Sequence, residues 1–150
     1  LRENNCSIFS CSDPDPTKWR KIAHVEDPLW RGKYPNPFHM VFSLDSSKLY
    51  LTILHPSPAY SGIMVIDTKT WTIKKEIQGI GPDLQTPAIT YDGKYVLTPF
   101  SGFQRQSSGI SVIDTSTDTL VAPPTSAVSA TDWPATTGPT AAALIDGSEP

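Results

Sequence analysis

The sequence is poor in several residue types that would point to particular classes of protein. It has only 2 cysteines, Cys6 and Cys11, in 150 residues. These are too few for the disulfide framework of a small secreted domain or for a four-thiolate zinc site. Lysine and arginine together number 12 against 15 acidic residues, which gives a formal charge of −3. Because no basic patch or stripe is present, we expect no nucleic-acid partner.

Long apolar runs and common catalytic motifs are also missing. No apolar stretch approaches the roughly 20 residues of a membrane-spanning helix, so no membrane span is expected. The sequence has neither a glycine-rich phosphate loop nor a G-x-S-x-G nucleophile elbow. It begins at Leu1 rather than Met and shows no secretory signal, so we expect a mature form or a fragment. Its 15 prolines favour turns over long helices.

What the chain does contain is an internal repeat of 47 residues. The segment GIMVIDT at residues 62–68 recurs as GISVIDT at residues 109–115. Residues 35–45 and 82–92 align at the same spacing. A lysine and a tyrosine-containing run follow in each repeat, beginning at Lys48 and at Lys94. Aligning these two lysines implies that the second repeat loses one residue in its turn. Self-similarity at a fixed period predicts a repeat architecture.

Each repeat predicts four short strands, because runs of β-branched and aromatic residues alternate with turns rich in Asp, Gly, Ser and Thr. The strands predicted in the first repeat are residues 40–44, 49–54, 63–66 and 71–77. Those predicted in the second are residues 87–91, 95–100, 110–113 and 120–121. At the ends of the chain, residues 7–13 and 19–25 match the last two strands of a repeat, and residues 140–147 match the first.

Four-stranded repeats of this length predict an all-β fold built from β-propeller blades of four antiparallel strands. The predicted organisation is the end of one blade (1–34), two blades (35–81 and 82–122), a Pro/Thr/Ala-rich loop (123–139) and the start of another blade (140–150). A closed propeller needs four to eight blades. About three blades therefore indicate part of a larger or oligomer-completed propeller. The expected partners are the remaining blades, from the same longer chain or from another copy.

The first repeat carries the spaced motif P-x-x-x-H-x-x-x-S-x-D-x-x-x-L-Y, followed by V-I-D-T-x-T. Its residues are Pro35, His39, Ser43, Asp45, Leu49 and Tyr50, then Val65, Ile66, Asp67, Thr68 and Thr70. This motif resembles the YVTN-type β-propeller repeat, whose general pattern cytochrome d1-like propellers share. The resemblance covers residues 35–122 and departs from the pattern at Thr86, which stands where the first repeat has His39. Related propellers include surface proteins, lactonases and haem or copper oxidoreductases, so the resemblance implies a fold and leaves the function open.

The candidate site lies at one end of the predicted blades. Because neighbouring strands are antiparallel, the start of the first strand and the end of the second lie together. His39 precedes the first predicted strand and His55 follows the second, so both are expected beside the mouth of the central channel. They are candidate metal or cofactor ligands, with copper or haem as the candidate group, or a candidate acid/base pair. Arg105, in the equivalent loop of the next blade, is a candidate contact for an anionic ligand. Structural roles for both histidines, and a solvated position for Arg105, stay open.

Two main functions are compatible with these residues. The first is a non-enzymatic, extracytoplasmic scaffold, periplasmic or extracellular, that binds a ligand or partner at the channel mouth. The alternative is part of a metal- or haem-dependent oxidoreductase propeller with His39 and His55 near the redox centre. A lactonase-like hydrolase would need a metal bound by carboxylates in the channel, and no residue pattern favours one. Asp67 and Asp114 open Asp-Thr-x-Thr segments and are predicted to be turn residues rather than catalytic ones.

Overall fold

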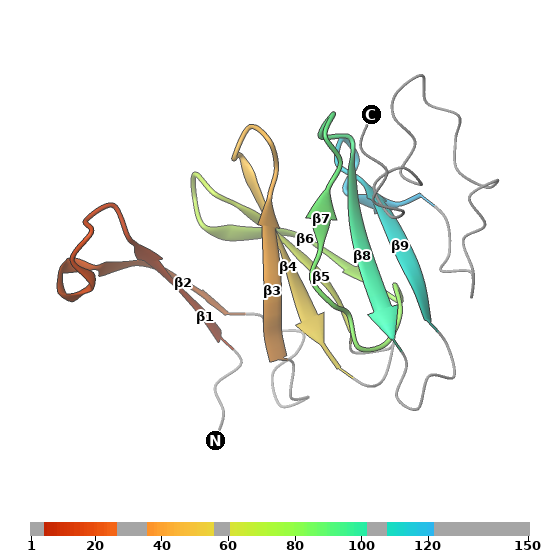
Figure 1. The fold of residues 1–150 in the computed structure, drawn as a ribbon, viewed down its shortest axis with the longest axis horizontal. Coiled ribbons are helices and arrows are strands. Elements are labelled where there is room, and N and C mark those ends of the chain that lie inside the picture. The colour runs from red at the N-terminus through yellow and green to blue at the C-terminus, as the bar shows by residue number, and fades with distance from the viewer. Residues whose placement is uncertain (1–4, 27–35, 56–60, 102–107, 122–150) are drawn as a thin grey trace, which may run out of the picture.

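The computed structural model describes residues 5–26, 36–55, 61–101 and 108–121. Within these ranges the protein consists of ten strands and one short 3-10 helix, Pro16–Lys18, with no α-helix. The strands form two four-stranded sheets and one two-stranded hairpin, all antiparallel (Figure 1). The predicted all-β fold with four-stranded blades is thus confirmed. No helix in this part of the chain is long and apolar enough to cross a membrane.

Each sheet follows the strand order expected of a blade, with consecutive strands side by side. Blade 1 consists of β3 (Asn36–Phe42), β4 (Lys48–Leu54), β5 (Gly62–Asp67) and β6 (Thr72–Gln78). Blade 2 consists of β7 (Ala88–Ile89), β8 (Tyr95–Ser101), β9 (Ser108–Asp114) and β10 (Thr119–Leu120). The N-terminal hairpin consists of β1 (Asn5–Ser10) and β2 (Arg20–Glu26). The sheets do not close a ring within the described ranges, as expected of a partial propeller. The predicted loop 123–139 and strand 140–147 lie outside the described residues.

Aspartates organise the turns between strands. The Asp45 carboxylate accepts hydrogen bonds from the Ser43 hydroxyl at 2.6 Å and from the Ser47 N–H at 3.1 Å. In blade 2, the Asp92 carboxylate accepts a hydrogen bond from the Thr90 hydroxyl at 2.7 Å. The Ser43 hydroxyl and the backbone and hydroxyl of Ser47 all favour the ionised carboxyl, which lowers the pKa of Asp45 to about 2.

The second set of turns uses the same device. Asp67 accepts the N–H of Lys69 and of Thr70, each at 2.9 Å. Asp114 accepts the N–H of Ser116 at 2.7 Å. Side-chain oxygens that bind the backbone two or three residues ahead are typical of Asx turns. The prediction that both aspartates serve turn geometry is confirmed.

The strand register shows that the 47-residue spacing continues unbroken through the first turn of each blade. Lys48 pairs with Asp67 in blade 1, and Tyr95 pairs with Asp114 in blade 2. The expectation that the second turn loses a residue, which equated Lys94 with Lys48, is therefore wrong. Both turns close alike, because Ser46 (φ 58°) and Gly93 (φ 72°) adopt the same left-handed conformation. Tyr95, not Lys94, stands in the place of Lys48.

The N-terminal hairpin differs from the blades in its turn. Its first strand was expected to run to Asp13 but ends at Ser10. Asp13 instead accepts the N–H of Asp15 at 2.9 Å. Asp15 in turn accepts the N–H of Thr17 at 3.0 Å and caps the 3-10 helix. These local hydrogen bonds compete with strand pairing and end the strand early.

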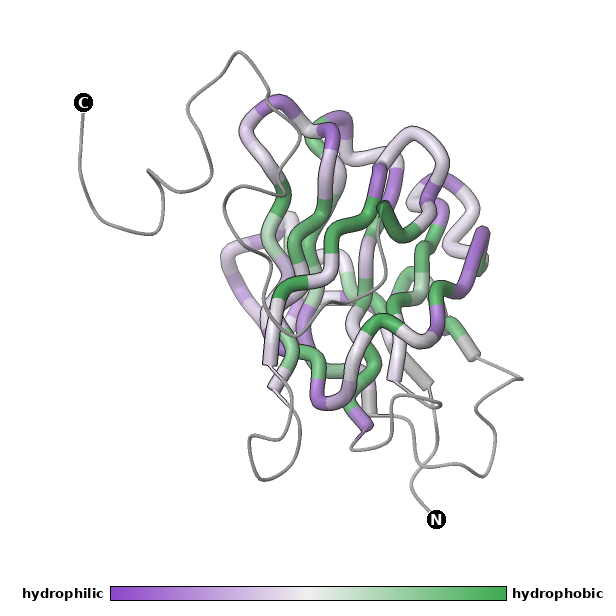
Figure 2. Tube along the Cα trace, turned by 90° about the vertical axis from the view of Figure 1, so that its right-hand side faces the viewer, coloured by the Kyte–Doolittle hydropathy of each residue, from purple (hydrophilic) through white to green (hydrophobic). Residues whose placement is uncertain are grey.

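Two hydrophobic clusters hold the sheets together, one at each interface. The first lies between blades 1 and 2 and consists of Tyr50, Ile63, Val65, Ile77, Ile80, Leu84, Val96, Phe100 and Ile113. The second lies between blade 1 and the hairpin and consists of Val25, Leu49, Leu51, Ile53, Met64 and Ile66. Blade 1 thus contributes alternate residues of its strands to opposite interfaces, as the two-residue period of a strand requires. Figure 2 shows this distribution, with hydrophobic residues along the strands and hydrophilic ones at the turns.

Candidate functional site

The end of the blades where β3 begins and β4 ends, at the bottom of Figure 1, is the loop end. His55 follows β4, and its carbonyl accepts the N–H of Asp83 at 3.0 Å. The carbonyl of Asp83 in turn accepts the N–H of Ser101 at 3.4 Å. Ser101 pairs with Ser108 across the mouth of the loop between β8 and β9. Connections from both blades therefore meet at this end, as the antiparallel strand order predicts. Arg105 itself lies outside the described residues.

His39 lies within β3 and not before it, contrary to the prediction. The pairing of β3 with β4 is irregular between Pro37 and Met40, which places His39 in a bulge. The buried hydroxyl of Thr52 accepts the N–H of His39 and donates to its carbonyl, both at 3.0 Å. Because this hydroxyl satisfies both backbone groups of the bulged residue, pairing continues as far as Asn36. The sequence pattern contained no signal for the bulge.

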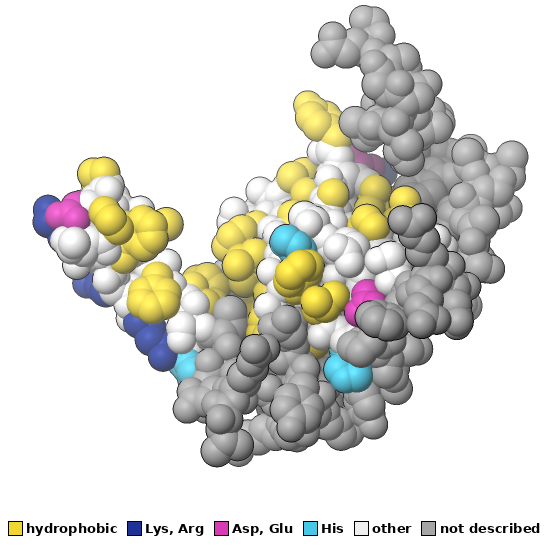
Figure 3. All heavy atoms as spheres, turned by 60° about the horizontal axis from the view of Figure 1, so that its bottom comes forward, with side chains coloured by type: hydrophobic (Ala, Val, Ile, Leu, Met, Phe, Trp, Pro, Cys, Tyr) yellow, Lys and Arg dark blue, Asp and Glu magenta, His cyan; other side chains and the backbone are white. Residues whose placement is uncertain are grey.

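The two predicted ligands occupy the loop end at different depths along the strands. His39 lies opposite Thr52, and Thr52 is three residues before His55. The positions of the two histidines therefore differ by about 10 Å along the strand direction. Both histidines are partly exposed, and the His39 ring lies edge-on to Phe38 with ring centroids 4.0 Å apart. With this end turned forward, the histidine side chains appear as separate patches (Figure 3). A shared metal at His39 and His55 stays a prediction.

Within the described ranges, no group of three or more His, Cys, Asp or Glu side chains could hold a metal ion. Zinc and copper sites generally use three or four protein ligands. The two histidines would therefore need further ligands from elsewhere in the protein. The third histidine, His24, is exposed on β2, with Nδ1 3.3 Å from Ser7 Oγ and 3.0 Å from Lys21 Nζ.

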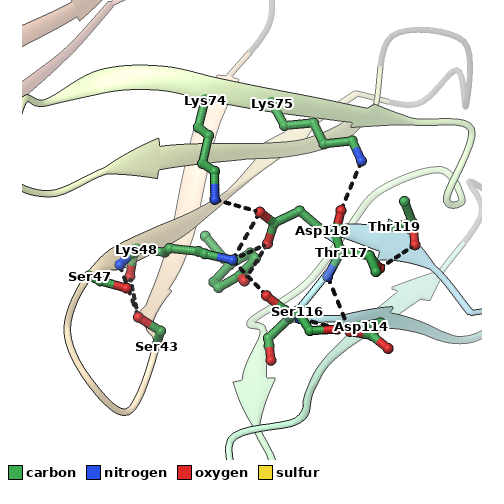
Figure 4. Close-up of polar contacts among 12 residues, drawn as sticks. Ser43, Ser47, Lys48, Lys74, Lys75, Asp114, Ser116, Thr117, Asp118 and Thr119 are labelled. Carbon is green, nitrogen blue, oxygen red and sulfur yellow. Dashed lines mark hydrogen bonds and ion pairs between the residues drawn. The ribbon is translucent and has the colours of Figure 1, made fainter.

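At the opposite end of the blades lies a buried polar cluster that was not predicted from the sequence (Figure 4). Asp118, only 3% exposed, reaches from the turn between β9 and β10 into blade 1. Its carboxylate oxygens lie 2.8 and 2.9 Å from Nζ of Lys48 and 3.3 Å from Nζ of Lys74. The Tyr50 hydroxyl donates to the same carboxylate at 2.7 Å. Lys48 also donates to the carbonyl of Thr115 at 2.6 Å, so the two blades are joined by ionic and neutral hydrogen bonds.

The environment of Asp118 keeps it ionised. Burial acts to raise the pKa of its carboxyl group, but the hydrogen bonds from Lys48 and Tyr50 and the charge of Lys48 outweigh this, so the pKa is lowered. For Tyr50, burial and the hydrogen bond to Asp118 both act in one direction and raise the pKa of the phenol well above its usual range. At neutral pH Asp118 is therefore a carboxylate and Tyr50 a neutral phenol. Such a cluster joins the two blades.

One sequence signal indicates that this turn has different neighbours in the two blades. Asp118 stands 47 residues after Trp71, at the same turn position. Both residues have positive φ, 53° and 56°. Trp71 packs against the apolar cluster between blade 1 and the hairpin, whereas Asp118 binds cations of blade 1. An aromatic and a carboxylate at one repeat position indicate neighbours of different chemistry.

Comparisons with known proteins bear on the fold alone. No family model and no curated protein matches the chain. Among solved structures, the chain is similar to hydrazine synthase of Kuenenia stuttgartiensis, with a TM-score of 0.56 and 19% sequence identity. The similarity covers 68% of this chain but 27% of that one, so the chain spans about a quarter of the structure it matches. At this identity the likeness is one of architecture and transfers no activity.

Proposed function

We propose that the chain is a segment of a β-propeller scaffold whose loop end, beside the central channel, binds a ligand or partner. The observation that carries this proposal is the convergence of connections from two blades at His55, Asp83 and Ser101. Loops held by a rigid sheet scaffold are common binding positions. We also propose that the protein belongs with the YVTN-type propellers and acts in the periplasm or extracellular space. The resemblance of the 47-residue repeat supports both statements.

The remaining blades, from the same longer polypeptide or from another copy, are the proposed structural partners. One blade cannot bury both of its faces by itself, so neighbouring repeats are needed for stability.

A second candidate function is an oxidoreductase propeller that holds copper or haem with help from His39 and His55. It is favoured by two partly exposed imidazoles at the loop end, one on β3 and the other directly after β4. Haem needs only one or two axial ligands from the protein, whereas a copper site would need ligands from other blades. Arg105 belongs to the candidate site as a contact for an anionic group.

Metal analysis and visible absorption spectra of the full-length protein, with and without added Cu²⁺ or haemin, distinguish these functions. If the oxidoreductase proposal holds, His39→Ala or His55→Ala should lower the bound copper or haem at least tenfold. The matched control is His24→Ala, which removes an exposed histidine of the hairpin and should leave the amount of bound copper or haem unchanged. If the scaffold proposal holds, all three variants should keep the metal content and melting midpoint of the parent protein. Equal loss in the His24 variant would argue against a site at the loop end.

A further inference from the structure

The face of blade 2 that points away from blade 1 is a second candidate surface, distinct from the loop end. In β9, Ser111 and Ile113 are buried toward blade 1, where the Ser111 hydroxyl donates to the carbonyl of Ile80. Strand alternation places Ile110 and Val112 on the other face. In β8, burial alternates in the same way, with Leu97 and Pro99 only partly buried. We call the surface formed by Leu97, Pro99, Ile110 and Val112 the distal face.

The repeat shows what normally covers such a face. One repeat earlier, Ile63 and Val65 of blade 1 occupy the places of Ile110 and Val112. Both are 0% exposed because blade 2 packs on them. Their counterparts on the distal face remain half-buried in the described part of the chain. The distal face therefore continues an established interface by one repeat.

The chemistry of the distal face differs from that of its counterpart on blade 1. There Lys48, Tyr50 and Lys74 bind the carboxylate of Asp118. In register, the corresponding residues of blade 2 are Tyr95, Leu97 and Val121. None of these is a cation, and a carboxylate buried against them would lose its counter-charges. Because an unpaired buried charge is strongly destabilising, an acidic side chain does not fit here.

The hairpin provides an independent example of the apolar alternative. Ile22 lies at the irregular position of β2 that Lys74 occupies in β6. The turn residue at the interface of blade 1 with the hairpin is Trp71, which packs on the apolar cluster there. At this position blade 1 has a cation, which binds Asp118, whereas the hairpin has an isoleucine that is 45% exposed. Val121, at the same position of blade 2, resembles Ile22 rather than Lys74.

We propose that the distal face binds a further blade of the same repeat, continuing the polypeptide after Val121, which presents an apolar side chain in the place of Asp118. Continuity with the interface of blades 1 and 2 supports this occupant. The sequence supports it too, since residues 140–147 repeat residues 86–93 with their Asp-Gly turn, although they lie outside the described ranges. The binding is hydrophobic, and it needs no ion pair of the kind that joins blades 1 and 2.

The interface between blades 1 and 2 can test, in the full chain, whether an apolar turn residue replaces Asp118 when the facing cations are replaced by apolar residues. Asp118→Trp alone should lower the melting midpoint by about 10 °C or more, because Lys48 loses its carboxylate. Adding K48Y, Y50L and K74V places the residue types of Tyr95, Leu97 and Val121 at the corresponding positions of blade 1, and should recover most of this loss. The positive φ is no obstacle, since Trp71 adopts it already. The triple variant K48Y/Y50L/K74V, which keeps Asp118, should be at least as unstable as Asp118→Trp, because the Asp118 carboxylate is then buried without a cation.

Two results would overturn the proposal. One is a quadruple variant no more stable than Asp118→Trp, or a triple variant as stable as the quadruple one. The other is a discrete dimer of the 150-residue chain that Val112→Lys dissociates, because a second copy would then be the occupant. We expect instead that sedimentation shows association without a fixed stoichiometry. Val112→Lys should reduce that association, and Ser116→Lys on an exposed turn should leave it unchanged. These measurements do not involve the ligand of the loop end.

Discussion

Blades 1 and 2 share a 47-residue repeat, yet they differ in how much of each sheet is buried. In blade 1, β4 and β5 are buried on both faces, because the hairpin packs on one side and blade 2 on the other. In blade 2, β8 alternates between buried and partly buried residues. The GIMVIDT and GISVIDT segments are nearly identical, so their own residues do not explain the difference. Burial in a repeat protein is conferred by the neighbouring repeat.

The largest effect is expected where the two blades are joined by charge. Asp118→Ala should lower the free energy of unfolding by about 3–5 kcal/mol, the usual consequence of removing one partner from a buried ion pair. Lys48, whose side chain is 16% exposed, would lose its carboxylate partner, and the Tyr50 hydroxyl would lose its acceptor. Urea unfolding measures the change. Lys75→Ala, which removes a single hydrogen bond to the carbonyl of Thr117, is the control and should change stability by less than about 0.5 kcal/mol.

The same substitution should change the pH dependence. A carboxyl group whose pKa is lowered by folding stabilises the protein above its unfolded pKa, and this contribution disappears as pH falls through the lowered folded pKa. For Asp118 the contribution should be complete above about pH 4 and lost in more acidic solution. Asp118→Ala should therefore unfold with a shallower acid dependence than the parent chain. Equal acid dependence in both proteins would contradict the proposed ionisation of Asp118.

A matched pair of isoleucines tests the difference in burial directly. Ile63→Ala removes a side chain that is 0% exposed, and should cost about 3 kcal/mol through lost burial and a residual cavity. Ile110→Ala, at the same position of blade 2, should cost about 1 kcal/mol, because its side chain is already partly in water. Denaturant unfolding compares the two. Similar costs would show that the distal face is covered in the 150-residue chain.

The smallest effect concerns the turns, which hold the same conformation with different residues. Ser46 and Gly93 both have positive φ, a region in which residues other than glycine are strained by about 1 kcal/mol. Ser46→Gly should therefore stabilise the chain by up to about 1 kcal/mol, less the entropy that glycine adds to the unfolded state. Gly93→Ala should destabilise it, also because its Cβ would lie 2.9 Å from Cδ1 of Leu44. Thermal melting should give a higher midpoint for Ser46→Gly, and a lower midpoint for Gly93→Ala, than for the parent protein.

Much of the fold could be predicted because its signals are local. Alternating apolar residues and Asp-containing turns recur at one spacing, and each strand is read from its own residues. The bulge at His39 could not be predicted, since it depends on a hydroxyl, Thr52, from the next strand. The early end of β1 also depends on competing bonds of Asp13. For the loop end, strand order alone predicted that the connections meet, but not which backbone groups of His55 and Asp83 join them.

The sequence by itself determined the repeat, the four-stranded blade and the ends at which loops and turns lie, because these follow from strand periodicity and antiparallel order. Only the tertiary structure decided which unlike residues meet across an interface. Trp71 and Asp118 have equivalent turns and equivalent backbones, yet one packs on hydrocarbon and the other accepts hydrogen bonds from Lys48 and Tyr50. Their partners are distant in the chain, and a contact between distant residues has no signature in the local pattern of either one. The chemistry of each interface is therefore a property of two neighbouring blades together.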